Sequence, residues 1–278
     1  MQRIPVTETL ISGWLKTRDP FSHKGDYGRA SLIAGSMGMM GAALLSARAC
    51  MRSGVGLLTV HVPECGYSIL QQGLPEAKCQ TDQHYTHHSY IDLPISTEAA
   101  GIGPGIGQHI PTQWALHRLL LHNLTVPMVL DADALNILAE NPEWLSQVPK
   151  GSIITPHPGE MRRLAMEPAE LALKYGITVV LKGHHTRIFV PEDNTVTVYE
   201  NTLHGNAGMA TGGSGDVLTG IILGLMAQHY NAKEAAVLGV WIHALAADIA
   251  LADGNSVESL LPSDIISHLG AAFNASRQ

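Results

Sequence analysis

The sequence predicts an α/β protein with a mostly parallel central sheet, and three observations support this fold class. Short runs of β-branched residues alternate along the chain with Ala- and Leu-rich runs of helical character. Glycine-rich turns lie between them, and polar clusters follow the predicted strands. A strand–helix–strand order of this kind makes the two strands parallel neighbours joined by a right-handed crossover.

The first such unit lies near the amino terminus. Residues 30–35 (ASLIAG) predict a buried strand, and residues 56–62 (GLLTVHV) predict the next one. Between them, residues 41–53 predict a helix with Ala and Leu on one side and with Arg48 and Arg52 off that side. The three segments form one strand–helix–strand unit.

The same alternation continues toward the carboxyl terminus. Strands are predicted at residues 99–102, 127–130, 152–155 and 178–181. Helices are predicted at residues 114–122, 169–175, 217–228 and 232–251. Residues 186–190 and 195–199 predict a hairpin across the polar turn EDN. No linker, repeat or low-complexity tract interrupts this pattern, so we expect one domain over residues 1–278.

Composition and charge exclude several functional classes. The chain has 278 residues, of which 45% are hydrophobic and 15% are charged, and this is too apolar for a disordered protein. The net charge of −7 argues against nucleic acid as a partner, because nucleic-acid-binding proteins carry a basic stripe. A phosphorylated small molecule is compatible with this charge, since local backbone amides can bind anions.

We expect a cytoplasmic protein. The cysteines, Cys50, Cys65 and Cys79, are few, odd in number and without a CxxC pattern, which predicts reduced thiols rather than disulfides or a zinc site. The amino terminus lacks the basic-then-apolar pattern of a signal peptide. No apolar run reaches the ~18–20 residues that span a bilayer, so no membrane association is expected.

Five polar or glycine-rich segments follow the carboxyl ends of predicted strands. These segments are residues 35–41, 103–107, 131–133, 156–160 and 182–186. Ligands of open α/β sheets bind at the carboxyl edge of the sheet. We therefore expect the five segments to converge on one crevice.

The strongest candidate for chemistry is the segment of residues 205–220 (GNAGMATGGSGDVLTG), which holds six glycines in sixteen residues. Gly212, Gly213 and Gly215 precede a predicted helix start and leave backbone N–H groups free to bind an anion. Asp216, at that helix start, is either an N-cap or a general base facing a hydroxyl that takes part in phosphoryl transfer. The glycines favour the general base, because an N-cap alone does not need them.

Two better-known phosphate motifs are absent or incomplete. The pattern GxxxxGK[ST] of a Walker loop does not occur in the chain. Residues 103–107 (GPGIG) contain GxG without the later glycine of a dinucleotide fingerprint. A ligand contact and a simple tight turn after a strand are both open for this segment.

Histidine and acidic residues at other strand ends are further candidates. Prolines on both sides of His157 restrict where its ring can point, which favours a functional role. Glu160 can cap the following helix, act on magnesium, or do both. Asp131 and Asp133 face one side of an extended segment and could hold magnesium through water. Alternatively, Asp133 is the N-cap of a helix at residues 134–139.

Two basic or histidine-rich segments complete the candidates. Lys182 and the flexible backbone of residues 183–186 fit a contact to a phosphate or a nucleotide, although an ordinary exposed lysine is the alternative. His84, His87 and His88 have no cysteine nearby, and their segment predicts a polar loop rather than a metal site.

Five segments, taken in order, carry a family resemblance. They are residues 24–60 (KGDYGRASLIAGSMGMMGAALLSARACMRSGVGLLTV), 131–138 (DADALNIL), 155–164 (TPHPGEMRRL), 179–186 (VVLKGHHT) and 205–225 (GNAGMATGGSGDVLTGIILGL). Together they resemble the ADP/ATP-dependent NAD(P)H-hydrate dehydratases of the ribokinase-like superfamily, from about Lys24 onward. The resemblance implies a three-layer α/β/α fold with a mostly parallel central sheet.

The resemblance also implies a repair reaction. The nicotinamide ring of NADH or NADPH can add water, and the family uses ADP or ATP to convert the (S) hydrate back to the dinucleotide. Transfer of the terminal phosphoryl group to the ring hydroxyl replaces hydroxide with phosphate, which is a better leaving group. Mg²⁺ would screen the phosphates.

The site residues implied by the resemblance fall into three groups. Asp216 would contact the hydrate and act as the base on its hydroxyl. The nucleotide and its transferring phosphoryl group would be held by Lys182, Gly183, His184, His185, Thr186, Gly212, Gly213, Ser214 and Gly215. The dinucleotide substrate would be lined by Ala42 or Ala43, Gly105 and His157. No residue is assigned as a metal ligand.

The chain departs from the family pattern at two places. The stretch between Glu160 and Val179 is short, which predicts a trimmed helix after PHPGE. His184 and His185 replace the small residues expected after Lys182-Gly183, and this could shift the nucleotide preference.

The same resemblance bears on the partners of this chain and on the alternative functions. No epimerase domain is expected in this chain, so an NAD(P)H-hydrate epimerase would be a separate protein. The Ala-rich helices at residues 43–50 and 235–252 lead us to expect a homo-oligomer. A vitamin-precursor kinase of the same superfamily is the main alternative, although PHPGE and GNAGMA favour the dehydratase. A non-catalytic nucleotide sensor is the alternative from another class.

Overall fold

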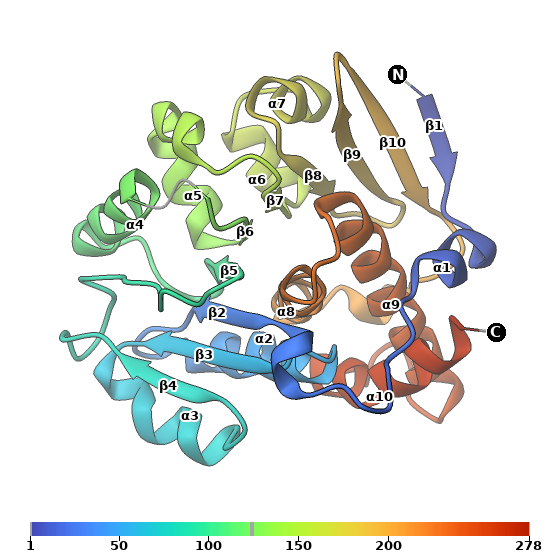
Figure 1. Ribbon diagram of the computed structural model, residues 1–278, viewed down its shortest axis with the longest axis horizontal. Coiled ribbons are helices and arrows are strands. Elements are labelled where there is room, and N and C mark those ends of the chain that lie inside the picture. The colour runs from blue at the N-terminus through green and yellow to red at the C-terminus, as the bar shows by residue number, and fades with distance from the viewer. Residues whose placement is uncertain (1, 123–124, 278) are drawn as a thin grey trace.

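Helices cover both faces of one mixed sheet in the computed structural model, which describes residues 2–122 and 125–277 (Figure 1). Within these residues the strands form a ten-stranded sheet in the order β1-β10-β9-β8-β7-β6-β5-β2-β3-β4. Every pair of neighbours is parallel except β8 with β9 and β9 with β10, so β9 runs against the others. The predicted α/β class with a mostly parallel sheet is confirmed.

The strands are short, as expected for an α/β fold. They are β1 (Gln2–Pro5), β2 (Arg29–Ile33), β3 (Leu57–Val62), β4 (Lys78–Thr81), β5 (Ala99–Ile102), β6 (Met128–Leu130), β7 (Ile153–Ile154), β8 (Thr178–Leu181), β9 (Thr186–Glu192) and β10 (Thr195–Asn201). The predicted hairpin is formed by β9 and β10; β9 extends past its predicted bound toward the turn, and β10 extends past its own at the open end.

The helices form the two outer layers. They are α1 (Glu8–Trp14), α2 (Met40–Arg52), α3 (Tyr67–Gly73), α4 (Ile110–His122), α5 (Asp133–Glu140), α6 (Pro158–Arg163), α7 (Pro168–Tyr175), α8 (Ser214–Ala227), α9 (Ala232–Ala252) and α10 (Pro262–Ala275). Helices α2, α8, α9 and α10 pack together on one face, whereas α4, α5 and α7 lie on the other (Figure 1).

Alternate residues of the central strands supply two separate cores. In β6, Val129 packs into the core under α8 and α9, while Met128 and Leu130 pack into the core under α4 and α5. In β8, Val180 packs into the core under α8 and α9, and Val179 packs into the other core. Because both faces are covered, the strands are apolar without interruption, as is usual for parallel strands buried on both faces.

Helices α2 and α8 approach each other closely enough to require glycine. A Cβ atom added at Gly220 would lie 2.1 Å from the carbonyl oxygen of Ser46, and one at Gly224 would lie 2.8 Å from that of Cys50. This contact between backbones fixes the position of α8, and with it the position of the glycine-rich segment that leads into the helix.

The long helix α9 is apolar but belongs to the core. With 21 residues and a mean hydropathy of 1.9 over its best window, α9 is long and apolar enough to cross a membrane by length and composition alone. Of the residues in that window, 72% are buried inside the fold, where α9 packs against α8 and α10. Lys233, Glu234 and Asp248 interrupt its apolar run, so the run itself stays shorter than the ~18–20 residues that span a bilayer.

Helix boundaries show where local patterns mislead. Helix α8 begins at Ser214 rather than at Val217, so Asp216 lies inside its first turn and Gly213 occupies the N-cap position. Helix α4 begins at Ile110, four residues before the predicted start. Strands β1 and β4 were not predicted, since both are mostly exposed edge strands with little apolar pattern.

Candidate functional site

A cavity of about 830 Å³ lies at the carboxyl ends of the central strands. Asp131 follows β6, His157 follows β7 and Lys182 follows β8, and all three line the cavity. Asp216 enters it from the first turn of α8. The cavity thus lies at the sheet edge where ligands of open α/β folds bind.

Most of the residues predicted to bind the nucleotide line this cavity. They are Lys182, Gly183, His184, Thr186, Gly213, Ser214 and Gly215, and the predicted base Asp216 lines it as well. His185 and Gly212 are chain neighbours of lining residues but do not themselves line the cavity. The ring of His185 stacks on that of His184, with 4.7 Å between the centroids.

The residues predicted to contact the dinucleotide lie in two separate places. His157 lines the cavity, whereas Ala42, Ala43 and Gly105 lie outside it. A Cβ atom added at Gly105 would be 3.0 Å from the Cβ of Ala42, so these two positions adjoin. Ala43 is fully buried and Ala42 is 9% exposed, so Ala42 is the one of the pair that reaches the surface.

The segments after β2 and β5 are tied to each other. Gly35 N donates to the carbonyl oxygen of Pro104 (2.8 Å), and the Ser36 hydroxyl donates to that of Gly105 (2.8 Å). Gly107 N donates to the carboxylate of Asp133 (2.9 Å), which links this pair of turns to the end of β6. Three of the five predicted segments therefore line the cavity, and the other two form a connected rim beside it.

Two carboxylates hold the ammonium group of Lys182 in the wall of the cavity. Its Nζ lies 2.7 Å from Oδ1 of Asp131 and 3.8 Å from Oε2 of Glu160. The hydroxyl of Thr219 donates to Oδ2 of Asp131 (2.8 Å). Burial by itself lowers the pKa of Lys182, but the two carboxylates outweigh it and raise the pKa, so the ammonium stays charged. Thr219 was not predicted; its only sequence signal is its place one turn after Asp216.

Asp216 is the third residue of α8, so the N-cap interpretation was wrong. Among the described residues, none forms a hydrogen bond or ion pair with its carboxylate. Burial, together with the charges of Asp131 and Asp133, raises its pKa, Lys182 opposes the rise, and the resulting pKa is about 7. A carboxyl that titrates near neutral pH and faces a cavity is suited to act as a general base.

The start of α8 provides a positive pocket next to Asp216. Gly213 has φ +97°, a left-handed conformation in which a side chain would be strained, and an added Cβ would lie 2.6 Å from Leu45 Cδ1. The first N–H groups of α8 are free of helical partners and carry the positive end of the helix dipole. Lys182 Nζ would lie 3.3 Å from a Cβ added at Gly215, so its charge adjoins this helix start.

His157 and Glu160 cap helix α6 reciprocally. Nδ1 of His157 accepts hydrogen bonds from Gly159 N (2.9 Å) and Glu160 N (3.3 Å), while Glu160 Oε2 accepts from His157 N (2.8 Å). The predicted capping role of Glu160 is confirmed, and α6 is only six residues long. Nε2 of His157 lies 3.5 Å from Glu160 Oε1, and the half-exposed ring lines the cavity.

The acidic residues after β6 are already engaged by the protein. Asp133 is the first residue of α5 rather than its N-cap, and it accepts from Gly107 N and Gln108 Nε2. The N-cap is Ala132, whose φ of 50° is unusual for a residue with a side chain. The carboxylate of Asp131 already binds Lys182 and Thr219, so Asp131 and Asp133 do not fit a dedicated Mg²⁺ site. Among the described residues, no group of three potential metal ligands lies here.

A further wall of the cavity is formed by Asn206, Met209, Val240 and other residues between β10 and α8 or on α9. Asn206 and Met209 belong to the predicted segment of residues 205–220, whereas the contribution of α9 was not predicted. Asp248 of α9 fixes this wall by accepting hydrogen bonds from Gly205 N (3.0 Å) and Asn206 Nδ2 (2.9 Å). These contacts join segments far apart in sequence, so no local pattern reveals them.

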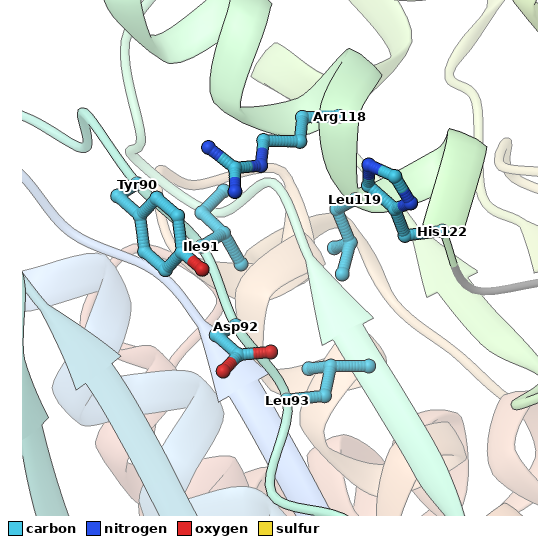
Figure 2. A pocket seen from close by; sticks show the side chains of 7 residues that line it. All are labelled: Tyr90, Ile91, Asp92, Leu93, Arg118, Leu119 and His122. Atoms are coloured by element: carbon cyan, nitrogen blue, oxygen red, sulfur yellow. The ribbon is translucent and has the colours of Figure 1, made fainter.

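A smaller cavity of about 330 Å³ lies apart from this site (Figure 2). It is formed between the segment Tyr90 to Leu93 and the end of α4, where the guanidinium of Arg118 lies 4.5 Å from the centre of the Tyr90 ring. None of the predicted functional residues lines it, so the larger cavity is the candidate site.

Comparison with known proteins gives consistent matches. A family model described as NAD(P)H-hydrate dehydratase matches residues 30–270. An ADP-dependent (S)-NAD(P)H-hydrate dehydratase of Listeria monocytogenes is 34% identical, covering 95% of this chain and 94% of its own. The bifunctional NAD(P)H-hydrate repair enzyme Nnr of Vibrio cholerae is 38% identical over 98% of this chain. The chain spans only about half the length of such bifunctional relatives, 54% in this case.

Solved structures agree with these sequence matches. The ADP/ATP-dependent NAD(P)H-hydrate dehydratase of Bacillus subtilis, co-crystallized with ATP/Mg²⁺, superposes with a TM-score of 0.79 at 31% identity and covers 97% of both chains. A ribokinase-like superfamily protein of Enterococcus faecalis gives a TM-score of 0.82 at 27% identity, covering 99% of this chain and 97% of its own. The predicted ribokinase-like fold is confirmed.

Proposed function

Because the chain belongs to the NAD(P)H-hydrate dehydratase family, we propose that it converts the (S) form of hydrated NADH or NADPH back to NAD(P)H, with ADP or ATP as phosphoryl donor. The observation that carries this proposal is Asp216, a mostly buried carboxyl with a pKa of about 7 beside an anion-binding helix start.

Asp216 begins the reaction as a general base. It removes the proton of the ring hydroxyl, whose oxygen attacks the terminal phosphorus of the nucleotide. The bond from that phosphorus to the bridging oxygen breaks, and AMP or ADP leaves. The lone pair of the ring nitrogen then expels the new phosphate group, and loss of a proton from the adjacent carbon restores the double bond. A kinase-like step thus ends as an elimination.

The start of α8 holds the phosphoryl group in transfer. Ser214 N already donates to the carbonyl oxygen of Thr211 (3.3 Å), so the N–H groups of Gly213 and Gly215 and the positive end of the helix dipole bind the phosphate oxygens, and Lys182 adds a fixed positive charge. The ion pair to Asp131 keeps the ammonium in place before the nucleotide arrives, so little reorganisation is needed during transfer.

The remaining predicted residues position the two substrates. Gly183, His184, His185, Thr186 and Gly212 complete the nucleotide subsite, and Met209 with Val240 provides an apolar wall suited to a planar base. Ala42, Gly105 and His157 form the rim for the dinucleotide, with Ala43 supporting Ala42 from below. Mg²⁺ bound together with the nucleotide would screen the charge of its phosphates.

The setting of the reaction follows from the same proposal. The chain acts in the cytoplasm, where the reduced dinucleotides occur, as one domain over residues 1–278 and as a homo-oligomer. An epimerase supplies the (S) hydrate from the other epimer, and the bifunctional relatives support this pairing of activities.

One assay tests the function directly. Purified chain is mixed with acid-generated NADH hydrate and either ADP or ATP, and recovery of the nicotinamide absorbance is followed. We expect recovery that depends on nucleotide, and Asp216→Asn should reduce the rate by about 10²–10⁴-fold. Unchanged binding of nucleotide to this variant is the control. Absence of recovery, with phosphorylation of a vitamin precursor instead, would establish the kinase alternative; full activity of Asp216→Asn would refute the assigned base.

A further inference from the structure

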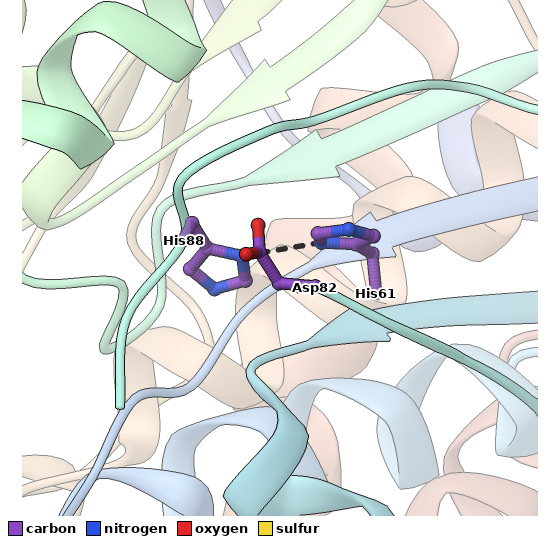
Figure 3. A group of neighbouring side chains, drawn as sticks. All are labelled: His61, Asp82 and His88. Atoms are coloured by element: carbon purple, nitrogen blue, oxygen red, sulfur yellow. Dashed lines mark hydrogen bonds between the residues drawn. The ribbon is translucent and has the colours of Figure 1, made fainter. Parts of the chain in front are cut away.

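Three potential metal ligands meet beneath the turn after β2, outside the proposed active site (Figure 3). His61 lies on β3, Asp82 directly follows β4, and His88 lies in the loop between β4 and β5. The nitrogen and oxygen atoms that they offer all lie within 4.8 Å of one another. All three side chains are buried, and His88 is fully so. Residues 84–88 form a loop, as predicted, but His88 turns into the interior instead of facing solvent.

Hydrogen bonds define which nitrogen of His88 is free. Its Nε2 lies 2.8 Å from the carbonyl oxygen of Gly35, which can only accept, so Nε2 carries the proton. In the neutral ring Nδ1 then carries the lone pair, and this atom lies 3.1 Å from Nδ1 of His61. Metal-binding histidines are commonly held in this way, with the outer nitrogen donating to a backbone carbonyl.

The spacing of these atoms also suits an ion. Two nitrogens bound tetrahedrally to Zn²⁺ at 2.0–2.1 Å lie about 3.3 Å from each other. The observed 3.1 Å is close to that value, and it equally fits a hydrogen bond between the two rings (Figure 3). A third potential ligand, the carboxylate of Asp82, lies beside both rings and favours the ion.

The cluster contains a buried carboxylate without a cation. Asp82 is 4% exposed and, among the described residues, forms no ion pair. Two imidazoles and a carboxylate are donors that a divalent transition-metal ion accepts together, and here all three are buried side by side.

Asp82 is already oriented by its own loop. Its Oδ2 accepts from Ser89 N (2.8 Å) and Tyr90 N (2.9 Å), and its Oδ1 accepts from His84 N (2.7 Å). The fourth donor, the Ser89 hydroxyl (2.6 Å to Oδ1), can rotate away without moving the backbone. That bond is the one an ion would replace.

We propose that His61, Asp82 and His88 bind one divalent transition-metal ion of the class that prefers imidazole and carboxylate ligands, such as Zn²⁺. Nδ1 of each histidine and Oδ1 of Asp82 are the ligands, and water completes the coordination. The ion joins β3 to the segment after β4 and, through Gly35, to the turn that leads into α2. Its role is structural, and it does not depend on the proposed repair reaction.

Titration of the metal-free full chain with Zn²⁺ against a chromophoric chelator tests this site. We expect one ion per chain bound tightly, and a rise in the unfolding midpoint that EDTA reverses. His88→Gln and His61→Leu should each weaken binding by at least about 100-fold, more than the 10–100-fold lost with an outer hydrogen-bond partner. Ser89→Ala should bind at least as tightly as the unchanged chain, because it only removes the competing donor.

Neighbouring surface histidines supply the matched control. His84, His87 and His109 lie close together, with ring centroids 3.6 and 5.0 Å apart, and could bind Zn²⁺ adventitiously. Their triple replacement by alanine should leave the tight site intact. Loss of the tight site in the triple variant, or no tight binding by the unchanged chain, would overturn the proposal.

A spectroscopic measurement avoids reliance on variants that could misfold. Co²⁺ bound to the unchanged chain should give the strong visible absorption of a four-coordinate ion with nitrogen and oxygen ligands. A weak, six-coordinate spectrum would contradict the buried site. Repair activity is measured separately on the metal-free chain. Its result tests the proposed reaction and does not bear on the metal site, so the two proposals can fail independently.

Discussion

At the scale of single residues, Asp216 and Lys182 set each other's ionisation. Burial and the charge of Asp131 push the pKa of Asp216 to about 7, and the ammonium of Lys182 limits the rise. The same ammonium is kept charged by Asp131 and Glu160. The site therefore holds a carboxyl that is basic enough to take a proton and a cation that does not lose one.

The first prediction concerns the pH dependence of catalysis. Because only the ionised form of Asp216 is a base, kcat/KM for hydrate repair should rise with pH through about 7. Lys182→Met removes the opposing positive charge, so the rise should move to higher pH as well as starting from a lower rate. Rates measured from pH 5.5 to 9 test this. A profile without a step in this range, or an unmoved step in Lys182→Met, would contradict the assignment.

The second prediction concerns stability at the same residue. The folded-state pKa of about 7 exceeds the ordinary value of 3.8, so ionisation of Asp216 opposes folding, and stability falls as pH rises from about 4 through 7. Asp216→Asn should therefore raise the free energy of unfolding at pH 8.5, by at most about 4 kcal/mol, with a smaller effect at pH 5. Urea unfolding at both pH values is the measurement. A variant less stable than the unchanged chain at pH 8.5 would show that the carboxylate is compensated in the fold.

At the scale of elements, the approach of α2 to α8 positions the catalytic segment. The third prediction is that Gly220→Ala destabilises the protein by about 3 kcal/mol or more, because its Cβ would overlap the Ser46 carbonyl, 2.1 Å away. Nucleotide binding should weaken as well, since α8 carries the phosphate pocket at its start. Thermal unfolding and nucleotide titration measure both effects.

Gly270 of α10 provides the matched control. An added Cβ there meets nothing within 4 Å, so Gly270→Ala should be neutral or stabilising by about 0.5–1 kcal/mol through helix propensity. Equal effects at the two glycines would mean that the contact between α2 and α8 is looser than 2.1 Å implies.

At the scale of the whole molecule, the cavity collects residues from several segments spread between Asp131 and Ala244. The fourth prediction is that nucleotide stabilises the entire fold, by about 2.7 kcal/mol at a concentration of 100 Kd. ADP should raise the unfolding midpoint more than adenosine, because the α8 start and Lys182 act on the phosphates. A concentration series in a thermal unfolding assay tests this. Equal shifts with ADP and adenosine would place the phosphates outside the pocket.

Local sequence patterns were enough to predict the fold class, the order of the central elements and the region of the site. Runs such as residues 99–102 and 178–181 were predicted at the bounds observed, because strand and helix periodicity is a local property. The glycine-rich approach to Asp216 was likewise visible as a pattern, since a tight approach of backbone to ligand requires residues without side chains.

Which charged groups face each other could not be predicted from the sequence, because it depends on how the chain packs. The pairing of Lys182 with Asp131 spans 51 residues and that of Thr219 with Asp131 spans 88, so no local pattern could reveal either. Burial, which sets the pKa of Asp216 and places His88 beside His61, depends on the same distant contacts. Chemistry at this site arises from charges removed from water together, and that removal is a property of the packed chain.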